Sequence, residues 1–350
     1  MTKTKIASLL CLAVIIVFSV SSVSAATENK IQSVSKNNEF KQNLKNLDTT
    51  NPVTKEITKK DNKTYDLPQV SGSVQMDENT KAIKVKFNGK EFKITDKDTK
   101  ALTNELVSGS LVRKNSDGDV ASSVEAVDGG IRIVLNIEKT TNKFYTYDFP
   151  VEAESGTKYI MNGQGAKLVT SDGKVIVSVI TPWATDSNKK SLKTWYTVEN
   201  NGTVLRQHVD LTGAKFPVLA DPTWCGNVVN SVKWVYRGDE HGNTLSIDPT
   251  WCGRILANAT SIWTLTGPMY AASYWTVNAV WDEVKSRYWS VYMSAVCYGR
   301  YSCYSNADLS MYNQLYCHMF AVPFKPDGWN LEPWRPVVSF SKYVQTQCNP

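Results

Sequence analysis

Histidine is scarce in this 350-residue chain, and the familiar short catalytic motifs are missing. The whole sequence holds three histidines, and none of them belongs to an H-E-x-x-H motif. It also lacks a G-x-S-x-G motif, a P-loop and a C-x-x-C pair. The patterns typical of zinc peptidases, serine hydrolases, nucleotide-binding proteins and zinc-binding modules are therefore absent. The sequence indicates no cofactor and no metal ion.

The one long apolar run lies at the N-terminus. Two lysines precede an apolar stretch over residues 6–20, and the small-residue sequence VSAA follows. This pattern predicts a signal peptide over residues 1–25. A membrane-spanning helix is the weaker interpretation because the run is short. A lipid anchor on Cys11 is disfavoured, since Leu10 stands where a lipoprotein signal has a small residue. We expect a secreted, extracellular protein with no transmembrane segment in the mature chain.

Composition divides the rest of the chain into three parts. Residues 26–66 are polar and have few apolar side chains, which is typical of a disordered spacer. Residues 67–220 contain alternating runs such as KAIKVKFNGKEFKIT and predict an all-β domain. We expect this domain to serve as a pro-region or a presentation module. Residues 221–350 hold nine of the eleven tryptophans and six cysteines. The overall fold class is therefore α+β, with an all-β domain before a small, disulfide-stapled α+β domain.

The predicted all-β domain has clear turn signals and no catalytic group. Asn88-Gly89 and Asn201-Gly202 each separate two strand-like runs, as expected for hairpins whose turns need positive φ. The sequence SDGK at residues 171–174 marks a further turn. The single histidine here, His208, lies in the alternating run VLRQHVDL. We interpret it as a solvent-facing strand residue rather than a catalyst.

The predicted C-terminal domain is electrically neutral and rich in aromatic residues. Its nine basic and nine acidic side chains give no basic stripe, so the sequence argues against nucleic-acid binding. Residues 229–250 read as a hairpin with His241 in its exposed turn. Residues 274–289 and 305–322 predict two helices. The first places Val277, Val280, Val284 and Tyr288 near one stripe, and the second is expected to bury Leu309, Tyr312, Leu315, Tyr316 and Met319. The Pro-rich end after residue 322 predicts extended loop and an edge strand.

The cysteines of an exported segment predict a disulfide framework rather than zinc ligands. The sequence DPTWCG occurs twice, at 221–226 and 248–253, and a bond between the two copies would close a loop around the predicted hairpin. Cys297 and Cys303 flank a short Gly-containing loop, and a bond from the second helix would tie down the C-terminus. We therefore predict three disulfide pairs: Cys225 with Cys252, Cys297 with Cys303, and Cys317 with Cys348.

The sequence GAKFPVLADPTW, residues 213–224, joins the two predicted domains. Its prolines disfavour regular structure. We predict that this linker is exposed and cleaved, which would release a C-terminal fragment.

Several motifs in residues 224–350 resemble a known family. WVYRGD, NLEPWRP and the terminal CNP look like the signature of an uncharacterised secreted bacterial domain, a domain of unknown function at the C-terminus of exported Gram-positive proteins. The region before it resembles a module that often precedes other C-terminal domains in such proteins. The family implies no activity, so the resemblance assigns none.

Three residues of the C-terminal region are candidates for acid/base chemistry: His318, Glu332 and Arg335. The alternative is that Glu332 and Arg335 form an ion pair that braces a Trp-Pro loop, while His318 makes a structural hydrogen bond. Three functions stay open on this basis. The first is an antibacterial effector, or toxin, acting at a competitor's cell envelope through the C-terminal domain. The second is a non-catalytic protein that binds cell wall, and the third is an envelope hydrolase. A glycan or a lipid headgroup of the envelope is the expected partner.

Overall fold

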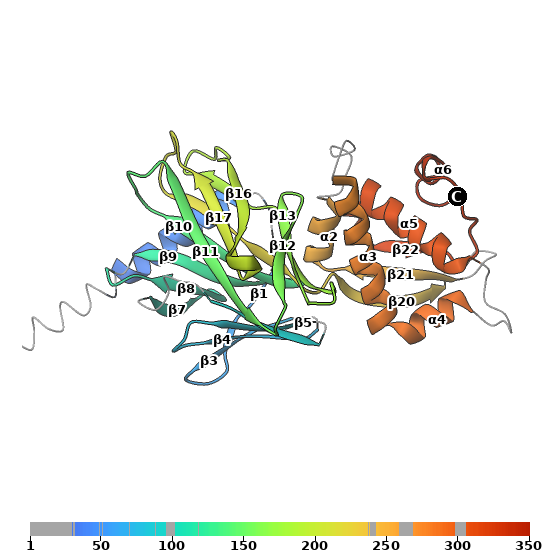
Figure 1. Ribbon diagram of the computed structural model, residues 1–350, viewed down its shortest axis with the longest axis horizontal. Helices are drawn as coiled ribbons and strands as arrows, with labels where there is room; N and C mark the ends of the chain where they lie inside the picture. The colour runs from blue at the N-terminus through green and yellow to red at the C-terminus, as the bar shows by residue number, and fades with distance from the viewer. Residues whose placement is uncertain are drawn as a thin grey trace, which may run out of the picture.

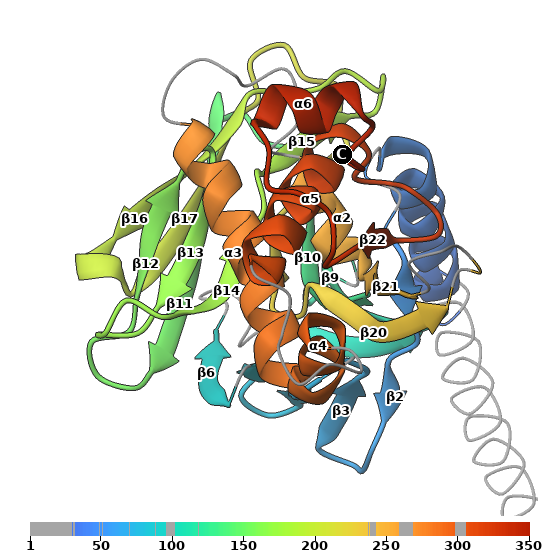
Figure 2. The same ribbon diagram turned by 90° about the vertical axis from the view of Figure 1, so that its right-hand side faces the viewer.

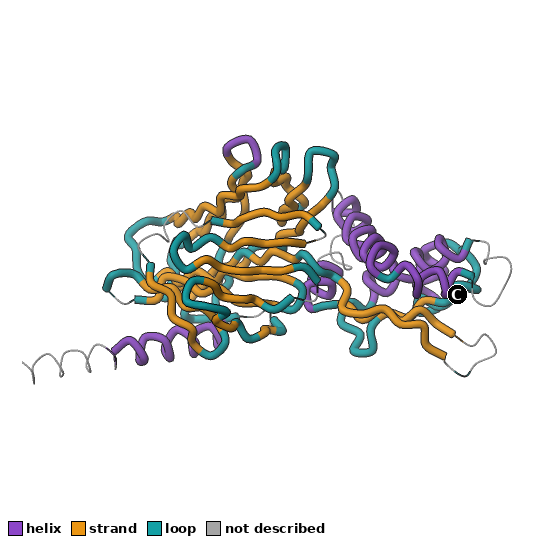
Figure 3. Tube along the Cα trace, turned by 90° about the horizontal axis from the view of Figure 1, so that it is seen from below, coloured by secondary structure: helices purple, strands orange, loops and turns teal. Residues whose placement is uncertain are grey.

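The structure is a computed structural model. It describes residues 30, 32–48, 50, 52–69, 71–87, 89–95, 102–117, 119–236, 238, 243–258, 269–297 and 306–350, with the backbone alone for 269–275. The chain forms two lobes (Figure 1). We call residues 32–228 the N-terminal lobe and residues 229–350 the C-terminal lobe. Figure 3 shows strands dominating the first lobe and helices the second. The predicted fold class is confirmed: an all-β region precedes a small α+β region, and the described residues form two complete disulfides, Cys225–Cys252 and Cys317–Cys348.

Two antiparallel sheets pack face to face in the N-terminal lobe. The first sheet has 11 described strands: β12 (Lys158–Asn162), β13 (Gly165–Val169), β14 (Val175–Val179), β19 (Thr223–Cys225), β10 (Gly130–Ile137), β9 (Val120–Val127), β8 (Ser110–Lys114) and β7 (Thr103–Val107) in spatial order, with β1 (Thr54–Lys55), β15 (Trp183–Asp186) and β18 (Val218–Asp221) off this path. The second has eight: β16 (Thr194–Glu199), β17 (Val204–Asp210), β11 (Phe144–Ala153), β6 (Lys90–Ile94), β5 (Ile83–Phe87), β4 (Ser73–Asp77), β3 (Thr64–Leu67) and β2 (Thr58–Lys59). The predicted hairpins are confirmed, since Gly89 lies between β5 and β6, and a short 3₁₀ turn, η2 (Asn200–Gly202), joins β16 to β17.

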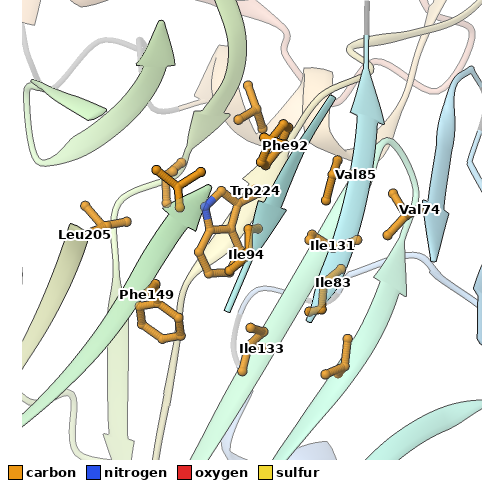
Figure 4. Close-up of a cluster of buried hydrophobic side chains, with 14 of the residues drawn as sticks. Val74, Ile83, Val85, Phe92, Ile94, Ile131, Ile133, Phe149, Leu205 and Trp224 are labelled. Carbon is orange, nitrogen blue, oxygen red and sulfur yellow. The ribbon is translucent and has the colours of Figure 1, made fainter. Parts of the chain in front are cut away.

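Trp224 sits in the core between these sheets. Its side chain is fully buried, and its ring meets the Phe149 ring edge-on with a centroid distance of 5.2 Å. The indole Nε1 donates to the Tyr159 hydroxyl at 3.1 Å, so its polar atom is satisfied. Figure 4 shows the indole among apolar side chains that come from strands of both sheets. The first DPTWCG copy therefore contributes its tryptophan to the core of the N-terminal lobe.

The prediction that residues 26–66 form a disordered spacer is wrong for the described part of this segment, from residue 32 onwards. Residues 32–47 form a helix that lies along the outer face of the first sheet (Figure 1). Phe40, Leu44 and Leu47, spaced i, i+4 and i+7, are buried against apolar residues of β8, β9, β10 and β18. Residues 54–67 then add three strands to the two sheets. These few apolar residues are enough to hold the helix because they pack against apolar side chains on the outer face of the first sheet.

A buried charge network lies under this helix. Arg132, on β10, is 1% exposed; it donates from Nη1 to Asp48 at 2.6 Å and from Nε to Glu125 at 3.0 Å. The Asp221 carboxyl lies close enough to interact electrostatically with Arg132. Burial raises the pKa of Asp221 to about 7, although Arg132 and the Thr223 hydroxyl act in the opposite direction. Strand β10 is consequently buried along its whole length rather than on one face.

The C-terminal lobe is built on a three-stranded antiparallel sheet in the order β20 (Val229–Tyr236), β21 (Asn243–Pro249) and β22 (Trp329–Leu331). The predicted hairpin and edge strand are confirmed, whereas His241 lies outside the described residues. The described helices are α2 (Trp251–Asn258), α3 (Met269–Arg287), α4 (Trp289–Val296), α5 (Ala307–Ala321) and α6 (Phe340–Gln345). Helices α3 and α5 match the two predicted helices, whereas α2, α4 and α6 were not predicted. Among the described residues, no helix is long and apolar enough to cross a membrane.

Candidate functional site

A disulfide joins the two lobes. Cys225 ends β19 of the first sheet, and Cys252 lies in the first turn of α2; their Cα atoms are 5.5 Å apart. The predicted pairing is confirmed, and its loop contains the β20–β21 hairpin. The two DPTWCG copies therefore meet at the junction between the lobes. Thr250 caps α2 there by accepting from the Gly253 amide at 3.0 Å, and its hydroxyl donates to the Asn227 carbonyl at 2.8 Å.

The turn between β9 and β10 docks against the start of α2. The Asp128 carboxylate accepts from the Trp251 amide at 2.9 Å, where the helix dipole favours a negative charge. The Asp128 carbonyl accepts from the Cys252 amide at 3.1 Å. Gly129, with φ of +92°, leaves no room for a side chain, because a Cβ atom there would lie 2.2 Å from the Asn227 oxygen. The lobes are thus joined by backbone contacts as well as by the covalent bond.

A second set of contacts holds α3 against the connection between the lobes. The Glu283 carboxylate accepts from the Val228 amide at 2.8 Å and forms an ion pair with Arg287. Arg287 also donates to the Val229 carbonyl at 3.1 Å, and the Tyr288 hydroxyl donates to the Asn230 carbonyl at 2.7 Å. Burial raises the pKa of Glu283, while the Val228 amide and Arg287 favour its charged form. These contacts fix the position of α3 relative to the first sheet.

The prediction of an exposed, cleavable linker is wrong for its second half. Residues 213–217 are partly exposed, but 218–224 run through β18 and β19 and are buried. Both strands pair with β10. A cut within 213–217 would leave these strands inside the sheet, so it would not free the C-terminal lobe. The predicted domain border at residue 221 also falls within the first sheet.

The two lobes enclose a cleft of about 680 Å³. One wall is formed by turns and strand ends of the N-terminal lobe: Ser71, Gly72, Lys86, Gly89 and residues 173–178. The other is formed by one face of α3, and Figure 2 shows this helix in front of β14. Cys225, Gly226 and Val228 line the cleft between the walls. The volume is in the range of small-ligand sites, which occur preferentially between domains.

Hydrogen-bond donors outnumber charged acceptors in this cleft. Lys86 and Lys174 are exposed on the N-terminal wall, and neither makes an ion pair within the described residues. On α3, Asn278 accepts from the Tyr312 hydroxyl through its Oδ1 at 2.7 Å, which leaves its amide donors for another partner. Asp282 is the exposed carboxylate on this wall. The arrangement suits a ligand with several acceptor oxygens.

The predicted catalytic residues lie elsewhere, on a polar stripe that joins α5 to β22 and the loop after it. Ser310, Gln314 and His318, spaced by four residues, are buried on one face of α5. They donate to the carbonyls of Arg335, Glu332 and Asn330 respectively, at 2.8, 2.8 and 3.1 Å. The predicted buried face of this helix is therefore partly wrong: Leu309 is 48% exposed because the polar stripe turns inwards.

Glu332 and Arg335 form the predicted structural ion pair. Arg335 Nε donates to Glu332 Oε2 at 2.8 Å, and Nη1 donates to the Pro350 carbonyl at 2.8 Å. The other carboxylate oxygen of Glu332 accepts from the Thr244 hydroxyl at 3.1 Å. The pair thus braces the 332–335 loop against β21 and the C-terminus. Each group already has a structural partner, so the geometry gives the hydrolase hypothesis no support.

Burial of His318 makes the C-terminal lobe sensitive to acid. The side chain is 3% exposed, Nε2 donates to the Asn330 carbonyl, and Nδ1 has no hydrogen-bond partner among the described residues. Burial lowers the pKa of His318 to about 4, and Lys325 and Arg335 contribute to the same shift. Because the unfolded chain binds this proton near pH 6.5, the contribution of neutral His318 to stability is lost as pH falls from about 6.5 to about 4.

We therefore expect His318→Gln to weaken the pH dependence of the unfolding free energy between pH 6.5 and pH 4. Glutamine keeps a donor for the Asn330 carbonyl but does not titrate. Urea unfolding of both proteins at several pH values measures the effect. Parallel pH profiles for the two proteins would contradict the burial of a neutral histidine.

The other residues singled out in the sequence are the remaining cysteines and His208, which are not part of this polar stripe. The Cys317–Cys348 disulfide is confirmed and links α5 to the C-terminus. Cys297 is disulfide-bonded, and its predicted partner Cys303 lies outside the described residues. His208 stacks on Trp195, with ring centroids 5.0 Å apart, and is half-buried rather than fully solvent-facing. Within the described part of the chain, no group of three or more His, Cys, Asp and Glu residues is placed to hold a metal ion.

Sequence reasoning missed the cleft residues because they come from distant segments. The turns at Gly89 and in SDGK were predicted, but nothing in the sequence indicated that α3 would face them. The lysines beside these turns, Lys86 and Lys174, looked like ordinary surface charges. The one usable signal was the pair of DPTWCG copies, whose predicted disulfide brings the two lobes together.

Comparison with known proteins identifies only the C-terminal lobe. Residues 229–350 match a family described as a protein of unknown function, DUF2599. The match begins at β20, directly after the connection between the lobes. No curated protein and no solved structure matches the chain.

Proposed function

We propose that this is a secreted, non-catalytic protein that binds a component of the Gram-positive cell envelope in the cleft between its two lobes. The observation that carries the proposal is the cleft itself: both lobes line it, and a disulfide and several buried hydrogen bonds hold its walls together. The signal peptide predicted from the sequence, together with the resemblance of the first lobe to modules of exported Gram-positive proteins, supports a location outside the cell.

The antibacterial effector is less favoured in the form in which cleavage releases the C-terminal lobe. Release would require removal of β18 and β19 from the first sheet and rupture of the Cys225–Cys252 bond. The envelope hydrolase is less favoured because His318, Glu332 and Arg335 are committed to contacts between α5, β22 and the C-terminus. Binding by the intact protein requires neither change.

Filling the cleft tests this function. Ser286 is exposed on the α3 wall of the cleft, so Ser286→Trp should obstruct ligand entry with little effect on folding. Ser290→Trp, on an exposed position of α4 outside the cleft, is the matched control. We expect the wild type and Ser290→Trp to co-sediment with washed Gram-positive cell walls and Ser286→Trp to lose most of this binding. Equal retention of all three proteins would refute the cleft as the site.

A further inference from the structure

We infer that the cleft binds an anionic wall polymer, specifically a chain of polyol or sugar phosphodiesters; this inference rests on the proposed function. Such a ligand carries one negative charge per repeat and many hydroxyl and ester oxygens. The charge and hydrogen-bonding character of the two walls favour it over a neutral glycan.

The N-terminal wall supplies the positive charge. Lys86 lies on β5 and Lys174 at the turn before β14, so two separate hairpins bring these exposed ammonium groups to the same cleft. Three other lysines on β5 and β6 form exposed ion pairs: Lys84 with Glu91, Lys90 with Glu154 and Lys93 with Glu152. Within the described residues Lys86 and Lys174 form no ion pair, although Lys86 lies opposite Glu91 in the register of β5 and β6. Compact, flexible ammonium groups bind phosphate as point charges.

The α3 wall is suited to the rest of such a chain. The Asn278 Oδ1 accepts from the Tyr312 hydroxyl, which leaves the two amide donors of Asn278 for a ligand. Arg287 and Glu283 neutralise each other, so they add no net charge to the cleft. Asp282 is the exposed carboxylate in the lining, and its negative charge repels an anionic ligand. The cleft keeps a net charge of about +1 when the two lysines are set against Asp282, which favours an anionic ligand modestly and makes binding sensitive to salt.

The cleft is open to solvent at the exposed lysines Lys86 and Lys174.

The test compares binding of three soluble probes by calorimetry: a glycerol phosphate oligomer, a galacturonate oligomer and a neutral glucose oligomer. We expect the glycerol phosphate oligomer to bind most tightly and its affinity to fall as salt rises. Lys86→Glu with Lys174→Glu should weaken it at least about tenfold. Asp282→Asn should strengthen it, by up to about fivefold, as expected for removal of one exposed repulsive charge. Lys139→Glu with Lys143→Glu, which changes the net charge equally at the far end of β10, should have little effect.

Preferential binding of the glucose or galacturonate oligomer would overturn the inference. So would binding to phosphatidylglycerol vesicles without binding to the glycerol phosphate oligomer. The wall assay separates the two proposals. If Ser286→Trp loses wall binding but Lys86→Glu with Lys174→Glu keeps it, the cleft is the site and the phosphodiester assignment is wrong. If neither variant loses wall binding, the proposed function fails as well.

Discussion

Arg132→Met should lower the free energy of unfolding by about 3–5 kcal/mol, because it leaves buried carboxylates without their cation. Glu125 is 3% exposed and receives hydrogen bonds from Arg132, and Asp48 anchors the end of the 32–47 helix to the same side chain. Methionine fills similar space but supplies no charge. The unpaired carboxylates must then stay charged in the interior or take up protons.

Urea unfolding at pH 7 measures this loss. Arg206→Met is the matched control: Arg206 pairs with Asp148 through two hydrogen bonds, but its side chain is 35% exposed, so we expect a cost of about 1 kcal/mol or less. Adding Glu125→Gln and Asp48→Asn to Arg132→Met should recover part of the stability. A cost for Arg132→Met no larger than the control would contradict the buried network.

Replacement of Cys225 and Cys252 by serine should lower the free energy of unfolding by about 3.5 kcal/mol. The estimate follows from the entropy of closing a loop in the unfolded chain, here with a sequence separation of 27 residues. The bond also joins β19 to α2, so its loss should loosen the cleft and reduce wall binding in addition to stability.

The Cys317–Cys348 bond provides a matched comparison, since its sequence separation of 31 residues predicts a similar entropic effect. It lies within the C-terminal lobe and links α5 to the chain end. Its double-serine variant should therefore lose stability but keep wall binding at temperatures where the protein stays folded. An equal loss of binding in both variants would show that the cleft does not depend on the bond between the lobes.

Local patterns in the sequence predicted much of the fold. The alternation of residues 83–94 around Asn88-Gly89 specified β5 and β6, and the spacing of Val277, Val280 and Val284 specified the buried face of α3, where all three are fully buried. The Cys225–Cys252 pair followed from the hairpin between the two DPTWCG copies. In each case the deciding interactions lie within about 30 residues of sequence, which is why the pattern was sufficient.

Features that depend on distant partners were not predictable in this way. The sparse apolar residues Phe40, Leu44 and Leu47 looked too few to fold, but β8, β9, β10 and β18 cover them. His318 on α5 resembled a catalytic residue because no pattern in the sequence indicated that β22 would fold back and bring the Asn330 carbonyl to its Nε2. The linker looked exposed because its prolines gave no sign that residues 218–224 continue the first sheet.

We expect one ligand to contact both lobes of the intact protein. Hydrogen exchange of the full-length protein, with and without soluble wall fragments, tests it most directly. We predict slower exchange in three segments together: the turns around residues 71–89, the β14 region at 171–178, and α3 at 276–287. Protection confined to one lobe, or centred on α5 and residues 329–335, would contradict the shared cleft.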